Sequence, residues 1–132
     1  MQFEYTKTEW SRGAIYVPTL PICINGFPVG HVLIDTGASA TLLPIELSDV
    51  FGVDLDRKNT MWFSAADGEK FAGIPSSEKV EFALEKSGFR PLIWHGTVFF
   101  VEEEETILLG QYQCLSELKI TLDGRKRMIT VE

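Results

Sequence analysis

The feature that most constrains the fold is the segment 29–39, where an apolar strand runs directly into a turn that carries a carboxylate. The run Val32-Leu33-Ile34 has the composition of a buried strand, and the next five residues are Asp35-Thr36-Gly37-Ala38-Ser39. Upstream, Asn25-Gly26 is a dipeptide that favours a tight hairpin turn. We therefore expect a hairpin whose second strand, 29–34, ends with Asp35 in a loop at the base of a cleft. Gly37 is expected to adopt a conformation closed to residues with a β-carbon.

The rest of the chain reads as short strands separated by turn residues, which predicts an all-β fold. Pro44 and Gly52 favour the start and end of a short helix over 45–51, and the spacing of apolar residues predicts a second over 111–118. The four glutamates of 102–105 are expected to form a solvated loop. The expected strands are 14–17, 20–24, 29–34, 41–43, 79–85, 93–101 and 106–110, with hairpins over 60–73 and 119–131.

Length and composition predict one globular domain over residues 1–132. No apolar run approaches the about 18 residues of a membrane span, so no membrane association is expected. A net charge of −7 argues against nucleic acid as a partner and leaves polypeptide as the natural one. The first ten residues lack the pattern of a secretory signal, and two cysteines are too few for a disulfide framework. We expect a cytoplasmic protein in which Cys23 and Cys114 are reduced, buried thiols.

Four sequence features in order carry a resemblance to a known family. They are Asp35-Thr36-Gly37-Ala38-Ser39, then Leu42-Leu43-Pro44, the hairpin turn Asp67-Gly68, and Ile107-Leu108-Leu109-Gly110 before a predicted helix. With these, the chain resembles the single-domain, retropepsin-type aspartic proteases, and cellular or prokaryotic members more closely than retroviral ones. The resemblance implies a retropepsin-like closed β-barrel that forms one half of a homodimeric enzyme.

The resemblance implies that Asp35 is the catalytic carboxylate. Hydrolysis by this route needs one carboxylate to take a proton from water and a second, protonated one to polarise the scissile carbonyl. Of the six aspartates in the sequence, only Asp35 precedes Thr-Gly or Ser-Gly. We therefore expect a homodimer in which the two Asp35 residues meet at a twofold axis. By the same resemblance, Thr36 bonds across the interface and Gly37 offers its carbonyl to the substrate backbone.

The hairpin 60–73 is the expected flap over the substrate. Its aromatic residues Trp62 and Phe63 face either the cleft or the core, and the sequence leaves both possibilities open. The remaining candidates are Ala66, Asp67 and Gly68 at the flap, Thr36, Gly37, Ala38 and Ser39 in the active-site loop, and Leu109 and Gly110 in the cleft wall.

Two positions depart from the viral pattern. Many viral members have an acidic residue where Ser39 stands and an arginine where Gln111 stands, and those side chains pair. Both positions are neutral here. We expect a hydrogen bond between Ser39 and Gln111, so that neither leaves a buried charge unpaired.

Other chemistries find little support in the sequence. His31 and His95 are the only histidines, which leaves little room for a Ser-His-Asp or Cys-His enzyme. There is no Cys-x-x-Cys pair, His-rich cluster or phosphate-binding glycine loop, so neither metal nor cofactor is expected. The sequence therefore predicts an aspartic endopeptidase that binds an extended peptide. The alternative is a weak or inactive dimeric peptide-binding or scaffolding module of the same fold.

Overall fold

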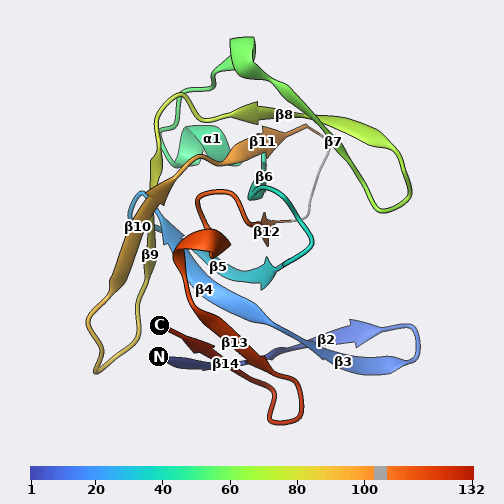
Figure 1. Cartoon of the computed structure of the whole chain (residues 1–132), viewed down its shortest axis with the longest axis vertical. Coiled ribbons are helices and arrows are strands. Elements are labelled where there is room, and N and C mark those ends of the chain that lie inside the picture. The colour runs from blue at the N-terminus through green and yellow to red at the C-terminus, as the bar shows by residue number, and fades with distance from the viewer. Residues whose placement is uncertain (103–106) are drawn as a thin grey trace.

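The computed structural model describes residues 1–102 and 107–132, and its described part is built mainly from strands (Figure 1). Helical structure there is limited to α1 (Leu47–Val50) and two short 3-10 helices, η1 (Arg57–Asn59) and η2 (Leu115–Glu117). The all-β prediction is confirmed. Residues 103–105 of the predicted glutamate loop, and residue 106 of the predicted strand 106–110, lie outside the described residues.

A large sheet forms the body of the molecule. In the described part it has nine strands in the order β10-β9-β4-β5-β12-β6-β11-β8-β7. Among the described residues, β10 and β7 each pair on one side only, so the sheet has two open edges there and no closed barrel is assigned. In chain order the strands are β4 (Thr19–Ile24), β5 (Phe27–Ile34), β6 (Leu42–Pro44), β7 (Met61–Ser64), β8 (Lys70–Pro75), β9 (Val80–Leu84), β10 (Leu92–Gly96), β11 (Phe99–Val101) and β12 (Leu108–Leu109).

Two smaller sheets lie at the base of the body. Strands β1 (Gln2–Glu4), β14 (Met128–Val131) and β13 (Ile120–Asp123) pair in that order, which brings both termini of the chain together (Figure 1). Strands β2 (Thr6–Trp10) and β3 (Gly13–Val17) form a separate hairpin. The final hairpin and β3 match the prediction, whereas β1 and β2 were not predicted, because Gln2–Glu4 and Thr6–Trp10 each contain a single apolar residue and so show no apolar alternation.

In the middle of the large sheet, two segments that are far apart in the sequence lie side by side. The chain runs from β5 through the Asp35 turn to β6, and β12 inserts between these two strands. It pairs in parallel with β5, with Leu109 opposite Ile34, and antiparallel with β6. In turn, β11 pairs in parallel with β6. The strands β5 and β12 are thus neighbours in space. Because β5 leads into the Asp35 turn and β12 leads into Gly110, Gly110 lies beside that turn.

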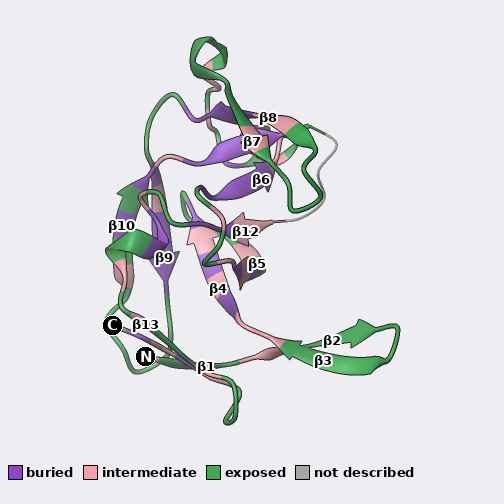
Figure 2. Ribbon diagram, turned by 45° about the vertical axis from the view of Figure 1, so that its right-hand side comes forward, coloured by how far each residue is buried: buried purple, intermediate pink, exposed green. Residues whose placement is uncertain are grey.

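The main core lies between the strands of the large sheet and the terminal sheet (Figure 2). Phe82 and Phe100 are fully buried, and Phe82 stacks on Trp94 with ring centroids 5.3 Å apart. Removing apolar side chains from water is the main driving force for this packing. A second, smaller apolar cluster connects β6, β11 and β12 to the β7–β8 hairpin. Its members are Ala40, Leu42, Phe63, Phe71, Phe99, Val101 and Leu108.

The prediction of a helix over 111–118 is wrong. Residues 111–114 form turns, and only the 3-10 helix η2 follows. The backbone of Gln113 is left-handed, with φ of 52°, which interrupts an α-helix. The side chain of Gln113 accepts a hydrogen bond from the backbone N–H of Thr97 at 2.8 Å. A contact distant in sequence therefore fixes this segment.

The predicted strand 93–101 is two strands, β10 and β11, separated at Thr97 and Val98. The first pairs with β9 and the second with β6 and β8, so the chain changes partners between them. Gly96 permits this change, because a β-carbon there would lie 2.2 Å from the carbonyl oxygen of Gln113. The predicted helix 45–51 is also shorter than expected and covers Leu47–Val50.

Candidate active site

The Asp35 turn is held by backbone hydrogen bonds at both of its ends. The N–H of Asp35 donates to the carbonyl of Leu109 at 3.0 Å, and the N–H of Ala38 donates back to the carbonyl of Asp35 at 3.1 Å. The N–H of Gly37 donates to Oδ1 of the Asp35 side chain at 3.0 Å. The side chain of Asp35 is half-buried, whereas Thr36 and Gly37 are exposed. The turn therefore fixes one carboxylate oxygen and presents the group at the surface.

Gly110 supports this turn from below. Its N–H donates to Oγ1 of the fully buried Thr41 at 3.1 Å, and its carbonyl accepts from Leu115 at 3.0 Å. A β-carbon at this position would lie 2.1 Å from the carbonyl oxygen of Ala40, which no real contact allows. Glycine is thus required where two backbone segments touch.

Gln111 and Tyr112 extend this support along the active-site loop. Their N–H groups donate to the carbonyls of Ala38 and Ser39 at 3.0 and 2.8 Å. The side-chain amide of Gln111 donates to the carbonyl of Thr36 at 3.0 Å, so its partner is the Thr36 backbone and not the expected Ser39. Four hydrogen bonds from β12 and the residues after it thus hold the loop.

A cavity of about 460 Å³ opens over the Asp35 carboxylate. Its floor comes from the active-site loop and β6, its wall from β12, and its cover from the β7–β8 hairpin. Leu109 and Gly110 were expected in the wall, but both are buried beneath the turn, and the wall residue from β12 is Leu108. The lining residues are Asp35, Gly37, Ala38, Leu42, Ser64, Ala65, Ala66, Phe71 and Leu108.

The β7–β8 hairpin has a compact tip. The N–H of Ala65 donates to the carbonyl of Glu69 at 2.8 Å, and the N–H of Gly68 donates to the carbonyl of Ala65 at 3.0 Å. Oδ1 of Asp67 accepts from the N–H of Glu69 at 2.9 Å, and Gly68 has φ of 88°. Asp67 and Gly68 therefore shape the turn, whereas Ala66 lines the cavity over Asp35.

The structure separates the two flap aromatics. Phe63 stacks on Phe71 with centroids 5.6 Å apart and meets the edge of Phe99 at 5.2 Å, so it joins the flap to the small core cluster. Trp62 points to the other face of the hairpin, where its side chain is 70% exposed. It lines a different depression with residues such as Arg57 and Glu102, which shares only Phe71 with the Asp35 cavity.

A second cavity, of about 550 Å³, is lined by Ser39, the last residue of the active-site loop, and by Ala40, which follows it. Phe63 and Phe99 supply an apolar part, and Asp56, whose carboxylate accepts from the Asn59 amide at 2.6 Å, supplies a polar one. Sequence reasoning missed this site because its residues come from five separate segments that share no motif. The further lining residues are Asn59, Met61, Pro75, Ser76, Thr97 and Tyr112.

The two cysteines are free, as predicted, but only Cys114 is fully buried. Burial raises the pKa of the Cys114 thiol from 9.0 to about 11. The pKa of the half-buried Cys23 thiol is also raised, first by burial and then by the nearby charge of Glu85. A thiol is nucleophilic only as a thiolate, so neither residue is poised for catalysis at neutral pH.

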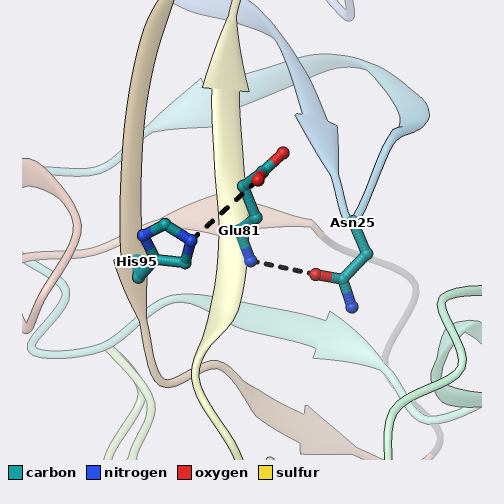
Figure 3. A network of polar contacts seen from close by, with 3 residues as sticks. All are labelled: Asn25, Glu81 and His95. Carbon is teal, nitrogen blue, oxygen red and sulfur yellow. Dashed lines mark hydrogen bonds and ion pairs between the residues drawn. The ribbon is translucent and has the colours of Figure 1, made fainter.

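The two histidines, His31 on β5 and His95 on β10, are both exposed. Figure 3 shows His95 on β10 facing Glu81 on β9, with 4.0 Å between Nε2 and the carboxylate. Both side chains are exposed, so the pair contributes little. The side chain of Asn25 accepts from the N–H of Glu81 at 2.9 Å and fastens the β4–β5 turn to β9 (Figure 3).

Across residues 1–102 and 107–132, no three side chains of the types that bind metals come together in a group that could hold an ion. In the same ranges, no helix has the length and apolar character needed to cross a membrane.

Comparisons with known proteins bear on the whole of this site. A comparison with curated proteins finds no match. A family profile described as aspartyl protease matches residues 20–112, which is most of the chain. The matched span includes the Asp35 turn, the β7–β8 hairpin and Gly110, the residue that supports the turn. The chain therefore belongs to the aspartyl protease family of the retropepsin-like clan.

Proposed function

We propose that this protein is an aspartic endopeptidase whose active site is completed by a second copy of the chain. The observation that carries the proposal is the Asp35 carboxylate, which is held by backbone hydrogen bonds, half-exposed, and open to a covered cavity of about 460 Å³. One chain supplies one such carboxylate, and the reaction needs two. A twofold axis is the simplest way to set identical residues face to face.

In the proposed dimer the two Asp35 side chains share one proton, because two carboxylates at such a short distance cannot both be ionised. The ionised carboxylate takes a proton from water, whose oxygen attacks the carbonyl carbon of the peptide. The protonated carboxylate gives its proton to the carbonyl oxygen. The carboxyl that took the proton from water then gives it to the amide nitrogen, and the other carboxylate takes a proton from a hydroxyl of the tetrahedral diol. The C–N bond breaks to release an amine and a carboxylic acid, which returns the pair to its starting protonation.

The substrate is proposed to lie extended between the active-site loop and the β7–β8 hairpin, held by backbone hydrogen bonds. Gly37 supports this placement. A β-carbon at Gly37 would meet only Oδ1 of Asp35, at 3.4 Å, and φ of Gly37 is not in the left-handed region expected from the sequence. The chain's own fold does not require glycine here, so we ascribe it to the approach of a substrate or partner backbone. Ala38, Leu42 and Leu108 favour apolar side chains beside the cut bond.

The Asp35→Asn variant tests the chemistry directly. Digestion of a mixed peptide library should slow by at least about a hundredfold, because positioned acid–base groups contribute roughly 10² to 10⁴ in rate. Asp67→Asn is the matched control, since it makes the same change at the flap tip and keeps the oxygen that accepts from Glu69. If Asp35→Asn cleaves as fast as Asp67→Asn, the proposed mechanism is wrong. Peptide binding by the parent without any cleavage would favour the scaffolding alternative.

Mixing experiments test the shared site. Adding an equal amount of Asp35→Asn chain should lower the activity per parent chain to about half, since mixed dimers have one functional carboxylate. The mixture must be equilibrated long enough for subunits to exchange. An activity that depends only on the amount of parent chain, at every ratio, would show that one chain is sufficient.

A further inference from the structure

The β2–β3 hairpin leaves the body of the molecule beside the Asp35 turn. Its root is fixed by Thr6, whose Oγ1 lies 2.5 Å from Oγ1 of Thr19. The next residue after the hairpin, Pro18, accepts a hydrogen bond from the N–H of Ile34 at 3.0 Å. Ile34 directly precedes Asp35, so the hairpin is anchored one residue from the proposed catalytic carboxylate.

The hairpin has two different faces. Thr8 pairs with Ile15, and Trp10 with Gly13, so these side chains share one face. Lys7 pairs with Tyr16 on the other face, where the guanidinium of Arg127 lies 3.6 Å from the centre of the Tyr16 ring. That second face is therefore tied to the turn between β13 and β14.

The first face is apolar and outside both core clusters. The exposed fractions are 54% for Trp10 and 38% for Ile15, and neither residue packs against the core formed by the described residues. A two-stranded hairpin is marginally stable alone in water, and an exposed apolar surface of this kind marks an interaction site. The hairpin, called the arm below, therefore presents an apolar face that another surface could cover.

The position of the arm indicates which partner covers it. In Figures 1 and 2 the β2–β3 and β7–β8 hairpins extend from the body on the same side. Figure 1 shows β5 running toward that side, between the two hairpins, to the turn that carries Asp35. The Asp35 turn and the arm therefore lie on the same side of the molecule, which is the side that a second copy must approach to set its own Asp35 opposite the first.

We propose that the β2–β3 hairpin is a dimerisation arm, which packs its Thr8, Trp10 and Ile15 face on a second copy of this chain. The inference rests on the proposed function, because it takes the position of the second copy from the shared site. The surface that receives the arm is a groove of about 200 Å³ beside Thr36. Its lining is mostly apolar and consists of Ile34, Thr36, Gln111, Leu115, Leu118, Ile120 and Leu122. In a symmetric pair each arm occupies the groove of the other chain.

Sedimentation of single-site variants tests the arm. Ile15→Asp and Trp10→Asp should each weaken dimerisation about thirtyfold, the effect typical of losing a central interface anchor. Ala14→Asp is the matched control, because Ala14 is also exposed but lies on the opposite face of the same hairpin. It should leave the dissociation constant within about threefold of the parent value.

Hydrogen exchange of the parent protein provides a test that does not depend on any variant folding. Amides of residues 6–17 should be protected at high concentration and lose protection when the dimer is diluted apart. If the parent dimerises but neither Ile15→Asp nor dilution has the expected effect, the arm is wrong and the proposed function stands. A chain that stays monomeric while cleaving peptides overturns both. Sedimentation of the Asp35→Asn protein tests the arm even if proteolysis fails.

Discussion

Replacing Gly110 by alanine should destabilise the fold and disable the active-site loop together. The added β-carbon would lie 2.1 Å from the carbonyl oxygen of Ala40 and 2.3 Å from its carbonyl carbon. Backbone atoms cannot rotate away as a side chain can, so the two segments must separate by roughly 1 Å to restore a normal contact. That movement strains the hydrogen bonds from Gly110 to Thr41 and from Leu115 to Gly110.

The size of the effect follows from these two terms. Overpacking a tight site costs about 1–3 kcal/mol, and leaving a buried backbone N–H without its partner costs about 1–3 kcal/mol more. We expect the free energy of unfolding to fall by about 2–6 kcal/mol, a large part of the usual 5–15 kcal/mol. For a domain of this size the melting temperature should fall by about 8–24 °C.

Thermal and urea unfolding of Gly110→Ala, followed by circular dichroism, measure this change. Gly124→Ala is the matched control, because a β-carbon at Gly124 meets nothing within 4 Å. Its stability should stay within about 0.5 kcal/mol of the parent value. Peptide cleavage should be lost in Gly110→Ala even below its melting temperature, since the displaced segment holds Thr36 and Ala38 through Gln111. A Gly110→Ala protein as stable as Gly124→Ala would refute the reasoning.

Three further changes separate the roles of neighbouring residues. Gly37→Ala should keep the free energy of unfolding within about 0.5 kcal/mol but abolish peptide cleavage; retained activity would show that no backbone approaches Gly37. Thr41→Val keeps the buried volume but removes the acceptor for the N–H of Gly110, so urea unfolding should show a loss of about 1–3 kcal/mol; an unchanged midpoint would mean that this bond is dispensable. Cys114 makes stability depend on alkaline pH: its pKa rises from 9.0 in the unfolded chain to about 11 in the fold, so its contribution to stability is complete below pH 9 and is lost as pH rises toward 11, by up to roughly 3 kcal/mol. The Cys114→Ala variant should lose this part of the pH dependence in urea unfolding at pH 8, 9 and 10, and an equal slope in both proteins would contradict the assignment.

The sequence was most informative where local chemistry decides the backbone. Asn25 and Gly26 have φ of 50° and 83°, as the predicted tight turn requires, and Gly68 supplies the positive φ at the tip of the predicted flap. The buried strand that ends at Asp35 was also predicted from its own composition. In these places a residue's own conformational preference and the fold agree.

Prediction failed where contacts between distant segments decide. The spacing of Tyr112, Leu115 and Leu118 is helical, yet Gln111 and Tyr112 bond to the active-site loop and Gln113 is left-handed. Tertiary hydrogen bonds outweigh a helical preference that is worth only tenths of a kcal/mol per residue. The cavity beside Ser39 was missed for the same reason, since its lining comes from segments that meet only in the folded chain.

Gly110 and Gly37 differ in whether the fold of the chain itself requires a glycine at that position. Gly110 is required by the chain itself, because Ala40 leaves no room for a side chain. The backbone of Asp35 is likewise satisfied from within, by Leu109 and Ala38. Gly37 has room for a β-carbon, and Asp35 is the one carboxylate among the described residues that line its cavity. The chain thus provides the hydrogen-bonded support of the site, and in the proposed mechanism the second carboxylate, and the backbone that accounts for Gly37, come from a second copy and a bound peptide. One supported carboxylate per chain is what the proposed shared site requires of each subunit.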